Sequence, residues 1–229
     1  MRRRILEFLP RAVGDSEALS SVRREQFLVY LMGPYRTFDV RALLPDDTEY
    51  DPETLPSFAT WNEHSGDYAE RDVLELLRET RDCLRDRGFN AFLAIDIGID
   101  LDTRDAATQS IEFARASNAV VFVAPHVGDN LGVGIEIGSV LEDTWSADRT
   151  SHSDSSHSDS ERPSQSRARR VLVATEPTVR SAMLRSVHTR WDASLRTFTD
   201  PTDLCRLCAQ FCTHIQNEEL FGNLDRMTP

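Results

Sequence analysis

Uncharged apolar runs are the feature that most constrains how this chain can fold. The clearest is Ala119 to Pro125, seven apolar residues without a charge, which is typical of a strand buried on both faces. Further strands are predicted at 27–32, 89–95, 170–175 and 195–198. Strands buried on both faces occur mainly in parallel sheets that helices cover on each side.

Helical patterns alternate with these strands along the chain. Apolar residues recur at helical spacing within 67–87, and Asp200-Pro201 is suited to begin a terminal helix at 201–221. Shorter helices are expected at 108–117, 133–145 and 178–188. The alternation predicts a doubly wound, mostly parallel five-stranded α/β sheet of Rossmann or flavodoxin type, with helices on both faces. Right-handed crossovers would bring the ends of the first and third strands side by side.

Composition divides the chain into one domain and its polar additions. Residues 146–169 are mostly Ser, Asp, Arg and His, and they contain the pentapeptide Ser-His-Ser-Asp-Ser twice. Such a segment cannot bury a core, so we predict a disordered insertion there. The expected organisation is an N-terminal helical extension at 1–25 and a single α/β domain formed by 26–145 and 170–229.

A second insertion, at 43–66, is acidic and contains three prolines. A loop of this length inside a compact domain is often a lid or a binding loop. Its aromatic residues Phe58 and Trp61 either cover the base of a ligand by stacking or pin the loop to the domain. The sequence leaves both interpretations open.

The charge balance is unusual because all 26 basic residues are arginine, against 38 acidic residues, for a net charge of −12. This balance is typical of proteins that work in high salt, where self-repulsion is screened. It argues against nonspecific nucleic-acid binding, which requires a basic face. The chain has no apolar run of transmembrane length and no signal-peptide core, so we expect a cytoplasmic protein without a membrane partner.

The four cysteines predict neither a disulfide framework nor a metal centre. Cys205, Cys208 and Cys212 have a spacing that suggests zinc at first sight. They also share one helical stripe with apolar residues, so core packing is the better interpretation. The acidic segment from Asp96 to Asp102 is interpreted as solvated surface, and no metal or cofactor is expected.

A glycine-rich segment follows the central strand and surrounds a single carboxylate. Glu136 stands between Gly134 and Gly138 and is expected in the first turn of a helix, just past the carboxyl end of the third strand. Ligands bind at this position in open α/β sheets, and glycines allow their close approach. The helix dipole alone also favours a glutamate there, which is the structural alternative.

A second loop carries the sequence Gly33-Pro34-Tyr35-Arg36 at the end of the first strand, and the expected topology places it beside Gly132 to Gly138. The two loops together resemble those of the nucleoside 2-deoxyribosyltransferase-like superfamily, which includes deoxynucleotide N-glycoside hydrolases. The resemblance covers roughly residues 26–145 and is closest over Gly132-Val133-Gly134-Ile135-Glu136-Ile137-Gly138. With the charge balance, it suggests a divergent haloarchaeal member.

The resemblance implies a small-molecule nucleoside or nucleotide as substrate. Glu136 would be the nucleophile that attacks C1′ of the sugar, and Tyr35 would orient its carboxylate or the sugar. Arg36 and the loop amides would hold a 5′-phosphate. The residues implied in substrate binding are Gly33, Pro34, Arg36, Asn130, Gly132, Val133 and Gly134. Relatives commonly build such sites between subunits, so a homo-oligomer is possible.

Two asparagines depart from the pattern of the superfamily. Asn118 stands where an aspartate before the third strand helps to handle the nucleoside, and Asn130 stands where transferases have an aspartate. The missing carboxylate would then come from Asp96, at the end of the second strand, or from Asp129. The leading hypothesis is an N-glycosidic hydrolase or transferase. A nucleotide-sensing domain without turnover and an NAD-cleaving enzyme are the alternatives.

Overall fold

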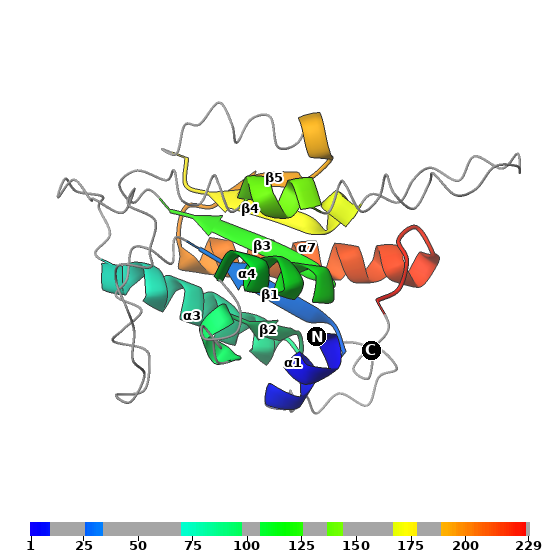
Figure 1. The fold of residues 1–229 in the computed structure, drawn as a ribbon. Coiled ribbons are helices and arrows are strands. Elements are labelled where there is room, and N and C mark those ends of the chain that lie inside the picture. The colour runs from blue at the N-terminus through cyan, green and yellow to red at the C-terminus, as the bar shows by residue number, and fades with distance from the viewer. Residues whose placement is uncertain are drawn as a thin grey trace, which may run out of the picture.

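A five-stranded parallel sheet forms the centre of the molecule, with strand order β2-β1-β3-β4-β5 (Figure 1). The strands are β1 (Leu28–Met32), β2 (Asn90–Phe92), β3 (Ala119–Ala124), β4 (Val171–Thr175) and β5 (Ser194–Thr197). The computed structural model describes residues 1–9, 26–33, 70–97, 106–125, 137–143, 167–177 and 189–227. The predicted doubly wound α/β architecture is confirmed.

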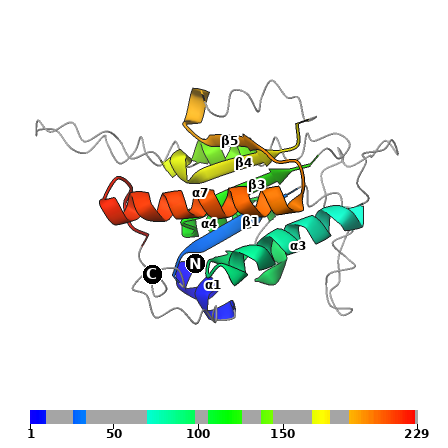
Figure 2. The same cartoon turned by 180° about the vertical axis from the view of Figure 1, so that it is seen from behind.

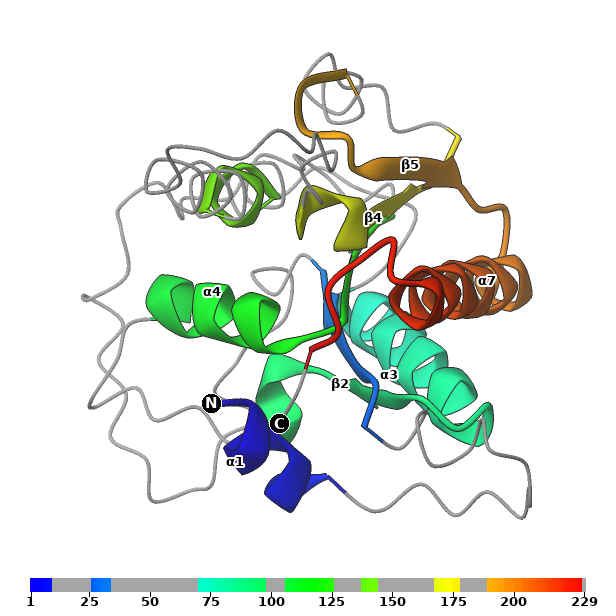
Figure 3. The ribbon, with the colours of Figure 1, turned by 90° about the vertical axis from the view of Figure 1, so that its right-hand side faces the viewer.

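Helices cover both faces of this sheet. α3 (Glu70–Asp86) and α7 (Pro201–Phe221) lie side by side on one face, while α4 (Ala106–Ala116) and the helical residues 137–143 lie on the other (Figures 2 and 3). The other helical segments are α1 (Arg2–Phe8), η5 (Ala94–Asp96), η6 (Arg167–Arg170) and 189–191. Among the described residues, no helix is long and apolar enough to cross a membrane.

Several segments for which the sequence makes a prediction lie outside the described residues. These are 10–25, 43–66, 146–166 and 178–188. The helical expectation for the start of the chain is therefore confirmed only at α1. Strands from both sides of the polar insertion nevertheless belong to one sheet, since β3 pairs with β4.

The strands divide the core into two layers because their side chains alternate between the faces. In β1, Val29 and Leu31 pack with α3 and α7, whereas Tyr30 packs with α4. The Tyr30 ring stacks on Phe92 at 5.1 Å between centroids and meets Phe113 edge-on at 5.5 Å. Because both faces of the sheet are buried, strands such as β1 and β3 consist of continuous apolar residues and do not alternate between apolar and polar ones.

The strand order creates a switch point between β1 and β3. The chain passes from β1 through α3 to β2, and then crosses back over β1 to β3. The register pairs Val29 with Ala119 and Met32 with Phe122, so the carboxyl ends of these two strands are neighbours. This confirms the predicted adjacency. Ligands of open α/β sheets bind in the crevice at such a switch point.

Capping residues determine where the two helices α3 and α7 begin or end. α3 is followed by Gly88, which has a φ of 85° and donates its N–H to the Arg85 carbonyl at 2.8 Å. α7 begins where the Asp200 side chain accepts the N–H of Asp203 at 2.8 Å, and it ends at Gly222, whose φ is 77°. Glycine adopts these left-handed conformations without steric cost. The predicted bounds of α7 are confirmed.

The second strand is shorter than the sequence predicts. An apolar run suggested a strand to Ile95, but β2 ends at Phe92 and η5 follows. The turn forms because the Asp96 carboxylate accepts the Leu93 N–H at 2.9 Å. β2 is an edge strand, and Arg85 covers it by donating Nε to the Ala91 carbonyl at 2.8 Å. Such cover protects an exposed edge from pairing with another chain.

Candidate functional site

The candidate site lies at the carboxyl ends of β1 and β3, where the two predicted loops leave the sheet. The structure describes three of the predicted site residues, which are Gly33, Asp96 and Asn118. The others lie outside the described residues: Pro34, Tyr35, Arg36, Asn130, Gly132, Val133, Gly134 and Glu136. The site can therefore be described through the strand ends that lead into these loops and the helices that pack against them.

Gly33 is buried immediately after β1 and is held there by α3. A Cβ atom at this position would lie 2.7 Å from Cδ1 of Leu77, whose side chain is itself fully buried. Real Cβ atoms do not approach other atoms so closely. Glycine therefore fits the packing of α3 against the end of β1, and a larger residue would have to displace the buried Leu77 side chain.

The helix that follows the glycine-rich segment packs as the sequence predicts. Ile137, Val140 and Leu141 are buried on the α4 face of the sheet. Gly138 differs from Gly33, because an added Cβ would meet no atom of the described residues within 4 Å. Packing does not demand glycine at 138.

Asn118 lies at the opposite edge of the sheet from the candidate site. It precedes β3, its Oδ1 accepts the Leu28 N–H at 3.0 Å, and its Nδ2 donates to both carboxylate oxygens of Glu219, at 2.9 and 3.1 Å. In a parallel sheet, the starts and ends of strands are on different edges, which a strand of this length separates by about 20 Å. The resemblance implies that the position of Asn118 helps to handle the substrate, whereas here its side chain contacts Leu28 and Glu219 at the other ends of the strands.

Glu219 is the centre of a buried polar hub at that amino-terminal edge. Besides Asn118, it binds the Arg170 guanidinium, which also donates to the Asn118 carbonyl at 3.1 Å and to the carbonyl of Asp225. Both ion-paired side chains are nearly inaccessible to solvent, at 7% for Arg170 and 11% for Glu219. The hub therefore joins α7, the start of β3, the residue before β4 and the C-terminal segment.

Arg2 brings α1 to the same hub. Its guanidinium donates to the Ala116 carbonyl at 2.7 Å and to the carbonyl of Gln26. Burial lowers the pKa of Arg2, the Glu219 charge opposes this shift, and the neighbouring Arg170 charge reinforces it. The sequence did carry a signal for this hub, since Glu219 continues the buried stripe of α7 where an apolar residue is expected.

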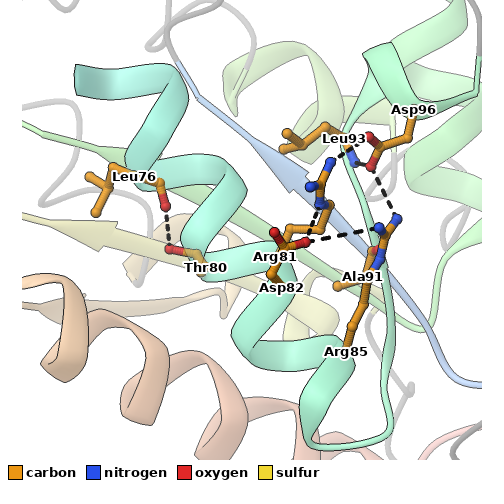
Figure 4. Close-up of polar contacts among 8 residues, drawn as sticks. All are labelled: Leu76, Thr80, Arg81, Asp82, Arg85, Ala91, Leu93 and Asp96. Carbon is orange, nitrogen blue, oxygen red and sulfur yellow. Dashed lines mark hydrogen bonds and ion pairs between the residues drawn. The ribbon is translucent and has the colours of Figure 1, made fainter. Parts of the chain in front are cut away.

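Asp96 is at the carboxyl edge, but its carboxylate is already engaged (Figure 4). Its oxygens accept from Arg81 at 2.6 Å and from Arg85 at 3.2 Å, in addition to the Leu93 N–H. Burial acts to lower the pKa of Arg81, but the hydrogen bonds and charges of Asp82 and Asp96 outweigh it and raise that pKa. The pKa of Arg85 is lowered, chiefly by burial. The predicted role of Asp96 in proton handling would require breaking these contacts.

The cysteines require one correction to the sequence interpretation. Cys83 of α3 and Cys205 of α7 form a disulfide, with their Cα atoms 6.2 Å apart. Cys208 and Cys212 are free and fully buried in the α3/α7 core layer, as predicted. Spacing along the chain could not show the bond, because 122 residues separate the two partners. No group of three or more potential metal ligands occurs among the described residues.

The fold and the site framework define a doubly wound α/β protein with a candidate ligand site at the β1/β3 switch point. The chain belongs to a protein family described as a domain of unknown function, DUF7509, whose model matches residues 7–228. This match includes every strand of the sheet. Searches of curated proteins and of solved structures found no significant match.

Proposed function

We propose that this protein binds a nucleoside or nucleotide at the β1/β3 switch point and cleaves or transfers its N-glycosidic bond through Glu136. The observation that carries the proposal is the pairing of β1 with β3, which makes the strand end at Gly33 and the strand end before the glycine-rich segment neighbours. Two sequence segments that resemble one active site thus leave the sheet at adjacent positions. The buried Ile137, covalently next to Glu136, ties that segment to the sheet.

In the proposed reaction, the Glu136 carboxylate attacks C1′ of the sugar and the bond from C1′ to the base nitrogen breaks. The bonding electron pair leaves with the base, which takes up a proton from a donor. Water or an acceptor base then attacks C1′ and releases the carboxylate, so the configuration at C1′ is retained. Arg36 and the amides of 132–134 supply positive potential for a 5′-phosphate.

The contacts of the described residues restrict which side chain can donate a proton to the leaving base. Asn118 is on the other edge of the sheet, and Asp96 is held by two arginines. Asp129, the other carboxylate considered from the sequence, is then the proposed donor. The contacts of Asp96 also favour a second candidate function, a nucleotide-sensing domain that binds without turnover, because a carboxylate considered for proton handling is paired with two arginines instead.

The arginine-only basic set and the net charge of −12 suit work in a cytoplasm of high salt, so the assay belongs in molar potassium chloride. The full chain is incubated with deoxynucleosides, deoxynucleotides and NAD, and free base is measured by chromatography. The mass in solution is recorded alongside, since a second subunit could complete the site. Release that Glu136→Gln abolishes supports the enzyme, and the substrate separates deoxynucleotide from NAD cleavage.

A matched control is available in the helical segment 137–143, which follows Glu136 in the sequence. Glu142 is half exposed and pairs with Arg190 at 3.8 Å on the surface, so Glu142→Gln removes an equal charge without touching the core. This variant is expected to retain full base release. Saturable nucleotide binding by calorimetry without base release supports the sensing domain instead. Absence of both binding and release contradicts the proposed site.

A further inference from the structure

A covalent bond joins the two helices that cover one face of the sheet. Cys83 lies in the C-terminal half of α3, and Cys205 lies in the second turn of α7. The helices lie side by side, and the disulfide adds a covalent link to their apolar packing (Figure 3). It connects parts of the chain that are 122 residues apart in sequence.

The helix that carries Cys83 is also the helix that contacts the carboxyl edge of the sheet. Leu77, six residues before Cys83, lies against Gly33 at the end of β1. Arg81 and Arg85, which flank Cys83 in sequence, bind Asp96 of η5, just past the end of β2 (Figure 4). α3 therefore touches the ends of two neighbouring strands, and whatever fixes α3 also fixes the start of the Gly33 loop.

The two sulfurs of the disulfide differ in their surroundings. Cys83 is partly exposed, whereas Cys205 is 8% exposed and Cys208, one turn further along α7, is fully buried. Burial raises the pKa of Cys208 to about 12, so its thiolate is scarce at neutral pH and it attacks the disulfide poorly. The accessible route to this disulfide is thus attack by an external thiol on Cys83.

We propose that the Cys83–Cys205 disulfide is a redox-sensitive clasp that holds α3 against α7 and thereby holds Gly33 at the edge of the candidate site. A cellular or added dithiol opens it. One thiolate of the dithiol attacks Sγ of Cys83, the disulfide breaks, and Cys205 leaves as a thiolate that takes up a proton. The second thiol of the reductant then displaces Cys83, so two electrons and two protons pass to the protein and the reductant becomes a disulfide. The clasp does not depend on which ligand the site binds.

Thiol counting tests whether the clasp forms. The purified full chain is unfolded in urea under argon and alkylated with iodoacetamide, with or without prior reduction by dithiothreitol. We expect two alkylated cysteines without reduction and four with it, as measured by mass spectrometry of the intact chain. Four alkylated cysteines without reduction would overturn the proposal.

Hydrogen exchange of the folded protein tests whether the clasp acts on the site edge. After reduction, amides in α3 and at Leu31–Gly33 should exchange at least about tenfold faster, whereas those of β4 stay unchanged. Cys83→Ser should exchange at the faster rate with or without reductant. Cys212→Ala, a control on α7 outside the disulfide, should keep the response to reduction. If amides at Leu31–Gly33 exchange equally fast before and after the disulfide is reduced, the bond does not act on the edge of the candidate site. That result would contradict the proposal.

Discussion

Replacement of Glu219 by glutamine is the sharpest test of how the sheet is held at its amino-terminal edge. The carboxylate accepts from Arg170 and, through both oxygens, from Nδ2 of Asn118. A glutamine amide offers one oxygen and one NH2 group, so one of these donors would face another donor. Asn118 cannot rotate its amide to compensate, because its Oδ1 accepts the Leu28 N–H. The variant leaves a buried guanidinium without its counter-charge.

Breaking a buried ion pair on one side typically costs about 3–5 kcal/mol, a large part of the roughly 5–15 kcal/mol that stabilises a native protein. For a chain of this size that corresponds to a fall in Tm of roughly 6–20 °C. The measurement is urea unfolding followed by circular dichroism, since urea leaves ionic strength free to be varied. Because the pair is buried, the loss should persist from dilute buffer to molar potassium chloride.

The surface pair of Arg115 and Asp143 provides the matched control. Nε of Arg115 donates to Asp143 at 2.8 Å, and the arginine side chain is 54% exposed. Half-exposed Arg115 is screened by salt although the Asp143 side chain is only 20% exposed, so Asp143→Asn should cost about 1 kcal/mol or less, and less still at high salt. If Glu219→Gln costs no more than Asp143→Asn, or if its cost disappears in salt, the hub does not hold the edge as described.

Three further predictions concern single sites. Gly33→Ala should lower the free energy of unfolding in urea by about 1–3 kcal/mol, because the added methyl group meets Leu77 of α3. Gly138→Ala should leave that free energy unchanged or raise it by up to about 1 kcal/mol. Equal effects of the two variants would refute the packing argument. Asn118→Asp replaces the Nδ2 donor to Glu219 with a second carboxylate, so it should destabilise by about 1–3 kcal/mol in urea unfolding, and an unchanged free energy of unfolding would refute it. Cys208, whose pKa burial raises to about 12, should resist alkylation in the folded protein at pH 8, and peptide mapping of a readily labelled Cys208 would contradict its burial.

Periodicity sufficed for most of the fold because each element has one dominant local signal. The uncharged run from Ala119 became β3, and the Asp200-Pro201 pair begins α7 where a capping aspartate and an N-terminal proline favour it. The second strand was overestimated at its end because apolar residues continue to Ile95, while the turn is imposed by contacts of Asp96 with Leu93 and α3.

Long-range contacts are what the sequence could not supply. The resemblance places Asn118 at a substrate-handling position, but its contacts depend on the direction of β3 and on Glu219, 101 residues away. The disulfide joins residues 122 apart, and no local pattern predicts which cysteines meet. The adjacency of the two candidate loops, by contrast, followed from the handedness of crossovers and was confirmed by the pairing of β1 with β3.

The central claim is that a nucleoside or nucleotide bound at the β1/β3 switch point is cleaved through Glu136. Its most direct test is free-base release by the wild type, Glu136→Gln and Glu142→Gln in molar potassium chloride, with folding checked by circular dichroism. Loss of a nucleophile should reduce release by about a thousandfold or more in Glu136→Gln, with no change in Glu142→Gln. Release that is equal in the folded Glu136→Gln variant and the wild type would contradict the claim.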